Sequence, residues 1–210
     1  MLRNIGSNWA VTLVTIAATY VLTPFVIHTL GHEGYGTWTL ITAMTGYMTL
    51  SALGVPMACV RYLAEHVAVH DTRAMNRVIG SCIGLYLAVG IVSLTIGGVL
   101  TALFTSLYDI PAYLRTEARF ACAVMVLQVS AGFLGLLPEG ILFAHHDFVT
   151  RNIVRVCALI LRLGLTVGLL TMQASLVLLA AVQLACLVFD FCVSLMLIRR
   201  RYTDVHIRLA

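Results

Sequence analysis

Three arginines lie in or beside one apolar stretch in the last third of the chain. Arg151, Arg155 and Arg162 are separated by four and seven residues, a spacing that places them on one face of a helix. The guanidinium group is permanently charged, and its planar donors match the oxygens of phosphate and carboxylate. Because a charged side chain deep in a membrane is costly, this face must contact protein or water rather than lipid. The pattern predicts either a site for an anionic group, such as a pyrophosphate, or a set of structural ion pairs.

Two acidic residues in neighbouring apolar stretches, Glu139 and Asp190, are the possible partners of these arginines. At a rise of about 1.5 Å per residue, both acids and Arg155 lie within roughly 5 to 12 Å of one end of their helices. We therefore expect Glu139 or Asp190 to form an ion pair with Arg155, although a substrate role for Arg155 stays open. Arg162 lies two helical turns deeper, and we assign it to the substrate. The two acids are alternatively groups that relay protons or couple a cation.

Small and hydroxylated residues form stripes along five of the apolar stretches. The first stripe is Asn8, Thr12, Thr15, Thr19 and Thr23, at helical spacing. The others are Thr39, Thr42, Gly46 and Thr49; Gly90, Ser93, Gly97, Thr101 and Thr105; Gln128, Gly132, Gly135 and Glu139; and Gln183, Cys186, Asp190 and Ser194. Such residues permit close packing of membrane helices, or they line a hydrated cavity when several stripes face one another. Five stripes, some with ionisable groups, predict a central cavity of the kind found in transporters and intramembrane enzymes.

The sequence lacks the motifs of common enzymes and of metal sites. It contains no G-x-S-x-G, H-E-x-x-H or G-x-x-x-x-G-K-[ST] pattern. Six cysteines lie within or at the ends of apolar stretches without C-x-x-C spacing: Cys59, Cys82, Cys122, Cys157, Cys186 and Cys192. His145, His146 and Asp147 are adjacent and point apart. We therefore predict no catalytic residues, no cofactor, no metal site and no disulfide framework.

The composition is that of a membrane protein. The chain has 210 residues, of which 60% are hydrophobic and 10% charged, whereas soluble domains have about 25% charged residues. A transmembrane helix needs about 20 apolar residues, and six such blocks fill the chain. We predict an all-α bundle of six transmembrane helices over residues 1–198, followed by a basic tail at 199–210. The six helices are predicted at residues 9–30, 37–60, 78–106, 120–143, 153–172 and 176–198.

The distribution of arginine predicts the orientation of this bundle. The net charge of +4 comes from thirteen basic residues, all arginine. Segments on the side of the N-terminus hold Arg3, Arg61, Arg73, Arg77, Arg151, Arg199, Arg200, Arg201 and Arg208, whereas those on the other side hold Arg115 and Arg119. Basic residues collect on the cytoplasmic side of membrane proteins, so we place both termini in the cytoplasm.

No basic run is interleaved with aromatic residues, which argues against a nucleic-acid partner. The segment 61–77 is predicted to form an interfacial helix, with Asp71 capping the third span.

Several short motifs mark the N-terminal part of the chain. They are Arg3-Asn4, Ser7-Asn8, Pro24, Leu30-Gly31, Tyr35-Gly36-Thr37-Trp38, Leu53-Gly54, Arg61, Ala64-Glu65 and Asp71. With these motifs the first eighty residues resemble bacterial polysaccharide flippases of the multidrug/oligosaccharidyl-lipid/polysaccharide exporter superfamily, which export O-antigen and other lipid-linked oligosaccharides. Family members typically have twelve or more helices in two lobes, and this chain looks like the N-terminal lobe. It departs from the family at Ser51-Ala52, where members often carry an acidic residue.

The resemblance implies the movement of an undecaprenyl-pyrophosphate-linked oligosaccharide across the bacterial inner membrane by alternating access, for the biosynthesis of polysaccharide such as lipopolysaccharide. Its implied partners are this substrate, the lipid bilayer and a second lobe or a second copy of the chain. The candidate substrate-binding residues are Arg61, Arg155, Arg162, Asn8, Thr12 and Thr19, and the candidate coupling or ion-pair residues are Glu139 and Asp190. Two other functions stay open: a non-transporting subunit of a polysaccharide assembly complex, and a membrane enzyme acting on polyprenyl phosphates.

Overall fold

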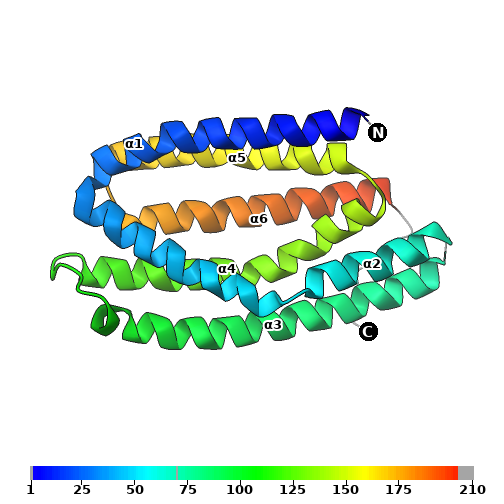
Figure 1. Cartoon of the computed structure of the whole chain (residues 1–210), viewed down its shortest axis with the longest axis horizontal. Helices are drawn as coiled ribbons and strands as arrows, with labels where there is room; N and C mark the ends of the chain where they lie inside the picture. Colours follow the sequence, from blue (N-terminus) through cyan, green and yellow to red (C-terminus); the bar gives the residue numbers. More distant parts are fainter. Residues whose placement is uncertain (1, 70, 203–210) are drawn as a thin grey trace.

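The computed structural model describes residues 2–69 and 71–202, and within residues 2–10 it describes side chains only at positions 6 and 9. The described chain is helical throughout, without strands, which confirms the predicted all-α fold (Figure 1). Its helices are α1 (Leu2–Met48), a short 3-10 helix (Thr49–Ala52), α2 (Val55–Ala68), α3 (Thr72–Leu107), α4 (Arg115–Ala144), α5 (Phe148–Met172) and α6 (Leu176–Arg201). Five stretches are long and apolar enough to cross a membrane: Val11–Ala52, Thr72–Leu107, Arg115–Ala144, Phe148–Met172 and Leu176–Arg201.

Helix α1 turns back on itself at Gly31. The backbone there has φ 72° and ψ 173°, a conformation that glycine adopts without the steric cost that a Cβ atom imposes. The two arms of α1 on either side of Gly31 run in opposite directions (Figure 1). The stretch Val11–Ala52 has 42 residues, about twice the length of one membrane span. The bend therefore divides the longest apolar stretch into two antiparallel arms.

The prediction of one continuous helix at residues 37–60 is wrong. Helix α1 ends at Met48, and the turn that follows has positive φ at Leu53 (26°) and Gly54 (81°). A new helix, α2, then begins at Val55 with Pro56 in its first turn. Proline lacks a backbone N–H and is tolerated at this position, where the helix leaves that donor unpaired. The Gly54-Val55-Pro56 sequence thus ends one helix and starts the next.

The segment 61–77 also differs from its prediction, because two helices share it. Helix α2 continues to Ala68, and α3 begins at Thr72 rather than near residue 78. The predicted cap is confirmed, since the Asp71 carboxylate accepts a hydrogen bond of 2.9 Å from the backbone N–H of Ala74. This bond satisfies one of the donors that a helix start leaves unpaired.

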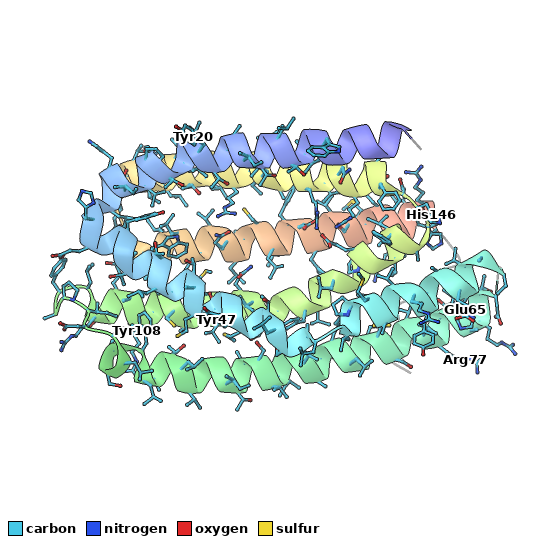
Figure 2. All side chains as sticks on the ribbon, viewed as in Figure 1. Tyr20, Tyr47, Glu65, Arg77, Tyr108 and His146 are labelled. Atoms are coloured by element: carbon cyan, nitrogen blue, oxygen red, sulfur yellow. The ribbon has the colours of Figure 1, made fainter. Side chains whose placement is uncertain are left out.

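The bundle has two ends, which Figure 2 marks with labelled side chains. His146 and Glu65 lie at the end where α1 begins and α6 finishes with Arg199, Arg200 and Arg201; we call this the basic end. Tyr108 lies at the opposite end, together with the bend of α1, and we call this the Gly31 end. Helices α3 to α6 run alternately between the two ends (Figure 1).

The glycine-rich stripes of α3 and α4 are packing surfaces. A Cβ atom built at Gly97 of α3 would overlap the methyl groups of Val126 on α4 and of Met48 on α1. One built at Gly90 would lie 3.0 Å from the carbonyl oxygen of Ser130 on α4. Built at Gly132 and Gly135, it would touch Leu187 of α6, at 3.8 and 3.6 Å. Gly97 and Gly90 let neighbouring helices approach closely, as small residues do in membrane bundles, whereas at Gly132 and Gly135 a Cβ atom would make only an ordinary contact.

The neighbouring glycines of α3 provide a matched test of this packing. We expect Gly97→Val to lower the free energy of unfolding by about 2 kcal/mol, because overpacking a closely packed interface typically costs this much. Gly98→Val introduces the same side chain into the same helix, at a position where a Cβ atom meets nothing within 4 Å, and should leave stability nearly unchanged. Denaturant unfolding of both variants in detergent micelles measures the difference. Equal stability of the two variants would contradict the assignment.

Candidate functional site

A cavity of about 270 Å³ lies between the two arms of α1 and helices α5 and α6. Its polar lining comes from all four segments: Thr15, Thr19 and Thr23 from the first arm, Thr39 and Thr42 from the second, Arg162 and Thr166 from α5, and Gln183 from α6. Apolar and aromatic residues complete the wall, among them Leu22, Tyr35, Trp38 and Leu179. Polar residues on four helical segments thus converge on one space, whereas the glycines of α3 and α4 contact neighbouring helices.

The threonines of α1 present acceptors to this cavity. The hydroxyl groups of Thr15, Thr19 and Thr23 each donate to the backbone carbonyl four residues earlier, at 2.8, 2.9 and 2.8 Å. Thr39 and Thr42 do the same on the second arm, at 2.9 and 3.1 Å. A hydroxyl has one donor and two acceptor lone pairs, so each oxygen keeps acceptor capacity after this bond. The α1 wall is therefore suited to ligands that carry hydroxyl donors.

Arg162 is the charged residue in the lining of this cavity. Its side chain is exposed, and within the described part of the chain it forms no ion pair. The thiol of Cys186 on α6 interacts with it electrostatically. The cavity therefore contains an uncompensated positive charge within an apolar span, a costly arrangement of the kind that usually marks a functional group in membrane proteins.

The other two arginines of α5 face acids. Arg155 Nη2 lies 3.0 Å from Glu139 Oε1, and two further hydrogen bonds of 3.3 Å join the same side chains. Arg151 Nη2 lies 3.7 Å from Glu139 Oε2. Asp190 on α6 accepts a hydrogen bond of 3.3 Å from Ser194 and interacts electrostatically with Glu139, Arg151 and Arg155. Two acids and two arginines thus form a charge-balanced cluster that joins α4, α5 and α6.

The structure separates the candidate residues into groups. Arg162 and Thr19 line the cavity. Arg155 contacts Glu139 instead. Arg61 is exposed on α2, which packs on α3 and α4, and neither it nor Thr12 belongs to the lining. Asn8 lies outside the residues whose side chains the structure describes. A substrate role for each of these residues stays a prediction.

Sequence reasoning did not assign Tyr35, Trp38 and Gln183 to the site. Tyr35 and Trp38 were noted as part of a short motif shared with the resembling family, yet both line the cavity. A signal was available, because Tyr35, Trp38 and Thr42 are spaced by three and four residues, which places them on one helical face. Gln183 lies one helical turn before Cys186 in the stripe of α6. Its amide adds donors and acceptors beside Arg162.

Polar contacts tie the helices together at both ends of the bundle. At the basic end, the Asp147 carboxylate accepts from Arg201 at 2.9 Å and from the Tyr202 hydroxyl at 3.3 Å, and burial followed by the charge of Asp147 raises the pKa of Tyr202. At the Gly31 end, the Tyr113 hydroxyl donates to Glu33, a bond that raises the pKa of Tyr113. Glu117 accepts from the backbone N–H of Leu176 at 2.6 Å, at the start of α6.

The described residues contain no group of three histidine, cysteine or acidic side chains placed to hold a metal ion. The site is instead a polar, positively charged cavity between apolar helices. Its chemistry is that of binding: a cationic donor set from Arg162, hydroxyl acceptors from the threonines and two aromatic rings.

A multi-pass helical membrane protein with a polar cavity between its helices is the class that the fold and the site define. The chain matches the model of a protein family described as polysaccharide biosynthesis protein over residues 1–209, and it belongs to this family. The match confirms the resemblance drawn from the N-terminal motifs. No curated protein and no solved structure matches the chain.

Proposed function

We propose that this protein is a transporter, not an enzyme, that moves an undecaprenyl-pyrophosphate-linked oligosaccharide across the bacterial inner membrane for the biosynthesis of a polysaccharide such as O-antigen. The observation that carries the proposal is the convergence of polar stripes from both arms of α1, α5 and α6 on one cavity around the unpaired Arg162. Membership of the polysaccharide biosynthesis family supports the class of substrate.

The cavity lining matches the chemistry of a lipid-linked sugar. The guanidinium group of Arg162 suits the pyrophosphate, because its fork of donors binds phosphate oxygens in pairs. The threonine oxygens suit sugar hydroxyls, which are donors, and Tyr35 and Trp38 offer apolar ring faces. The polyprenyl tail would stay in the bilayer between helices.

The size of the cavity bears on how the transporter is assembled. About 270 Å³ falls just below the range of about 300 to 1,000 Å³ that is typical of sites for small molecules. It therefore holds one part of a lipid-linked oligosaccharide. A second lobe or a second copy of the chain would enclose the remainder, and alternating access would arise between the two units.

We propose a topology of six spans with both termini in the cytoplasm. The Gly31 bend would be the first outer turn, so that the two arms of α1 become separate spans. The excess of arginine at the basic end supports this orientation, because positive residues are retained on the cytoplasmic side. The proposed direction of transport, from the inner to the outer leaflet, then runs from the basic end to the Gly31 end.

Water accessibility of the α1 stripe tests whether the cavity is hydrated. In a background with Cys157 and Cys192 replaced by serine, we expect Thr19→Cys to react with a membrane-impermeant thiol reagent. Thr95→Cys is the matched control: Thr95 is also an exposed threonine whose hydroxyl bonds to the backbone of its own helix, at 2.8 Å to Ile91, and it does not line the cavity around Arg162. The reaction should be at least tenfold slower at position 95, because lipid excludes the reagent.

Labelling separates the assembly subunit from the proposed transporter, and a second assay separates the enzyme. Equal protection at positions 19 and 95 would argue that the stripe is a packing surface, as expected for a non-transporting subunit of an assembly complex. An enzyme acting on polyprenyl phosphates would instead release phosphate from undecaprenyl pyrophosphate, which an assay with the purified chain detects directly.

A further inference from the structure

A second cavity, of about 460 Å³, opens between α3 and α4 at the Gly31 end of the bundle. Its lining includes two arginines, three threonines and one aromatic ring: Arg115, Arg119, Thr101, Thr105, Thr116 and Phe120. It is formed by the end of α3 and the start of α4, at the end of the bundle that the labelled Tyr108 marks in Figure 2. None of its lining residues belongs to the first cavity, which contains Arg162 and which we call the Arg162 cavity.

The charges of this second cavity are positive and uncompensated. Arg115 and Arg119 lie four residues apart on one face of α4, and no acidic residue is part of the lining. Arg115 uses its Nε to donate to the carbonyl of Ile110, at 3.0 Å, which holds the guanidinium group in place and leaves its terminal nitrogens available. Neither arginine forms an ion pair within the described residues. Glu117 is not part of this lining, and its carboxylate accepts a hydrogen bond from the backbone N–H of Leu176 on α6.

Further donors surround these two arginines. Helix α4 starts after Leu114, whose side chain provides no cap, so the first backbone N–H groups of a 30-residue helix lack an intrahelical acceptor. The hydroxyl of Thr116 lies in the same first turn, and Thr105 faces it from α3. Thr101, deeper in the cavity, is held by bonds to Gly97 and Cys122. Guanidinium, hydroxyl and N–H donors at a helix start are the set that binds phosphate.

The position of this donor set indicates the kind of ligand. The last turns of α3 and the first turns of α4 are the ends of two candidate membrane spans that lie at the same end of the bundle. The cavity between them is therefore at the depth of lipid headgroups. Arginines are disfavoured on the outer side of a membrane protein, yet both arginines of the segments at this end line this one cavity. The exposed ring of Phe120 provides an apolar surface beside them.

We propose that the α3–α4 cavity binds the phosphate group of an anionic lipid in the leaflet at the Gly31 end, with Arg115 and Arg119 as its principal ligands. The phosphate belongs either to a membrane phospholipid or to the polyprenyl carrier. The proposal goes beyond transport by the Arg162 cavity and does not depend on it.

Lipid binding by the purified full-length chain tests the proposal. Native mass spectrometry follows titrations with phosphatidylglycerol and, separately, with undecaprenyl phosphate, with phosphatidylcholine as the zwitterionic comparison. We expect the double variant R115Q/R119Q to weaken the binding of at least one anionic lipid by about tenfold or more, because each removed charge loses a charge-assisted hydrogen bond. Arg73→Gln removes an exposed arginine at the basic end and should leave both affinities unchanged.

The lipid whose affinity falls identifies the source of the phosphate. A loss with phosphatidylglycerol assigns the site to membrane phospholipid, and a loss confined to undecaprenyl phosphate assigns it to the carrier. Unchanged affinity for both lipids, or an equal loss in Arg73→Gln, overturns the proposal. If R115Q/R119Q does not fold, the same lipid titrations of Ala123→Trp test the proposal, because this substitution fills the cavity from an exposed position without changing the charge. Flipping is measured separately, so failure of this proposal is distinct from failure of the proposed transport.

Discussion

Replacing Arg162 with glutamine should lower the rate of flipping of an undecaprenyl-pyrophosphate-linked oligosaccharide by about a hundredfold. A charge-assisted hydrogen bond to phosphate contributes about 1.5 to 3 kcal/mol, and each 1.4 kcal/mol corresponds to tenfold. Arg162 is the charged residue of the cavity, so no neighbouring guanidinium group in the lining takes its place. The measurement is transfer of a fluorescent lipid-linked oligosaccharide between the leaflets of proteoliposomes.

The same substitution should raise the stability of the fold. An unpaired guanidinium group within an apolar span is costly, and glutamine removes the charge while keeping hydrogen-bonding groups. Loss of transport together with unchanged or raised stability indicates a functional arginine. If Arg162 were structural, its substitution would lower both transport and stability. Arg162→Lys keeps the charge but not the planar fork of donors, and we expect it to retain intermediate activity. Arg73→Gln is the control, and full flipping by folded Arg162→Gln protein would remove the proposed role.

The sequence contains enough information to predict the helical membrane fold, because hydropathy and length decide it. It predicts a loop at residues 31–36, because three of these six residues are glycines and glycine is a poor helix former, yet helix α1 continues directly after the bend at Gly31. The break before α2 has a readable signal in Gly54 and Pro56, but the apolar residues on both sides conceal it. Hydropathy is insensitive to a turn whose residues are themselves apolar, such as Leu53 and Val55.

The polar stripes show a second limit of sequence reasoning. Those of α1, α5 and α6 line the cavity, whereas the glycines of α3 and α4 pack against neighbouring helices. Glycine, serine and threonine serve both purposes in membranes, and helical spacing alone does not say which partner a face meets. The polar residues that line the cavity from α1, α5 and α6 are threonines, an arginine and a glutamine, whereas the residues of α3 and α4 that pack against neighbouring helices are glycines. Polar side chains large enough to reach a ligand are therefore the better predictor of a cavity.

The charge cluster could be anticipated more fully than the cavity. Counting residues from the end of each helix places Glu139 and Arg155 at similar depth, and their side chains are in contact. The second arginine on the same carboxylate is Arg151, which the sequence placed on the same helical face as Arg155 without assigning it to a particular acid. Its Nε is buried without a hydrogen-bond partner among the described residues. The pair depends on the relative rotation of α4 and α5, which sequence does not define.

Glu139→Gln should destabilise the protein by about 3 kcal/mol, because it leaves Arg151 and Arg155 within the bundle with Asp190 as the remaining acid of the cluster. The pair is only partly shielded, with 25% of the Glu139 side chain and 43% of the Arg155 side chain exposed, so solvent screening keeps the cost at the lower end of the range for buried pairs. Denaturant unfolding in detergent micelles measures the effect. Glu65→Gln is the matched control: Glu65 is exposed on α2 (Figure 2) and forms no ion pair within the described chain, so its loss should change stability by less than about 0.5 kcal/mol.

A second substitution distinguishes a balanced cluster from an isolated contact. In the Glu139→Gln background, Arg155→Gln should recover most of the lost stability, because it removes the charge that the first substitution left unpaired. In the unaltered protein the same Arg155→Gln should destabilise, since Glu139 would then keep only its longer contact with Arg151, at 3.7 Å. The coupling energy measured by the double-mutant cycle should therefore be opposite in sign to the loss of stability caused by each single substitution. Additive losses would show that Glu139 and Arg155 act independently, and the charge-balanced cluster of α4, α5 and α6 would then be wrong.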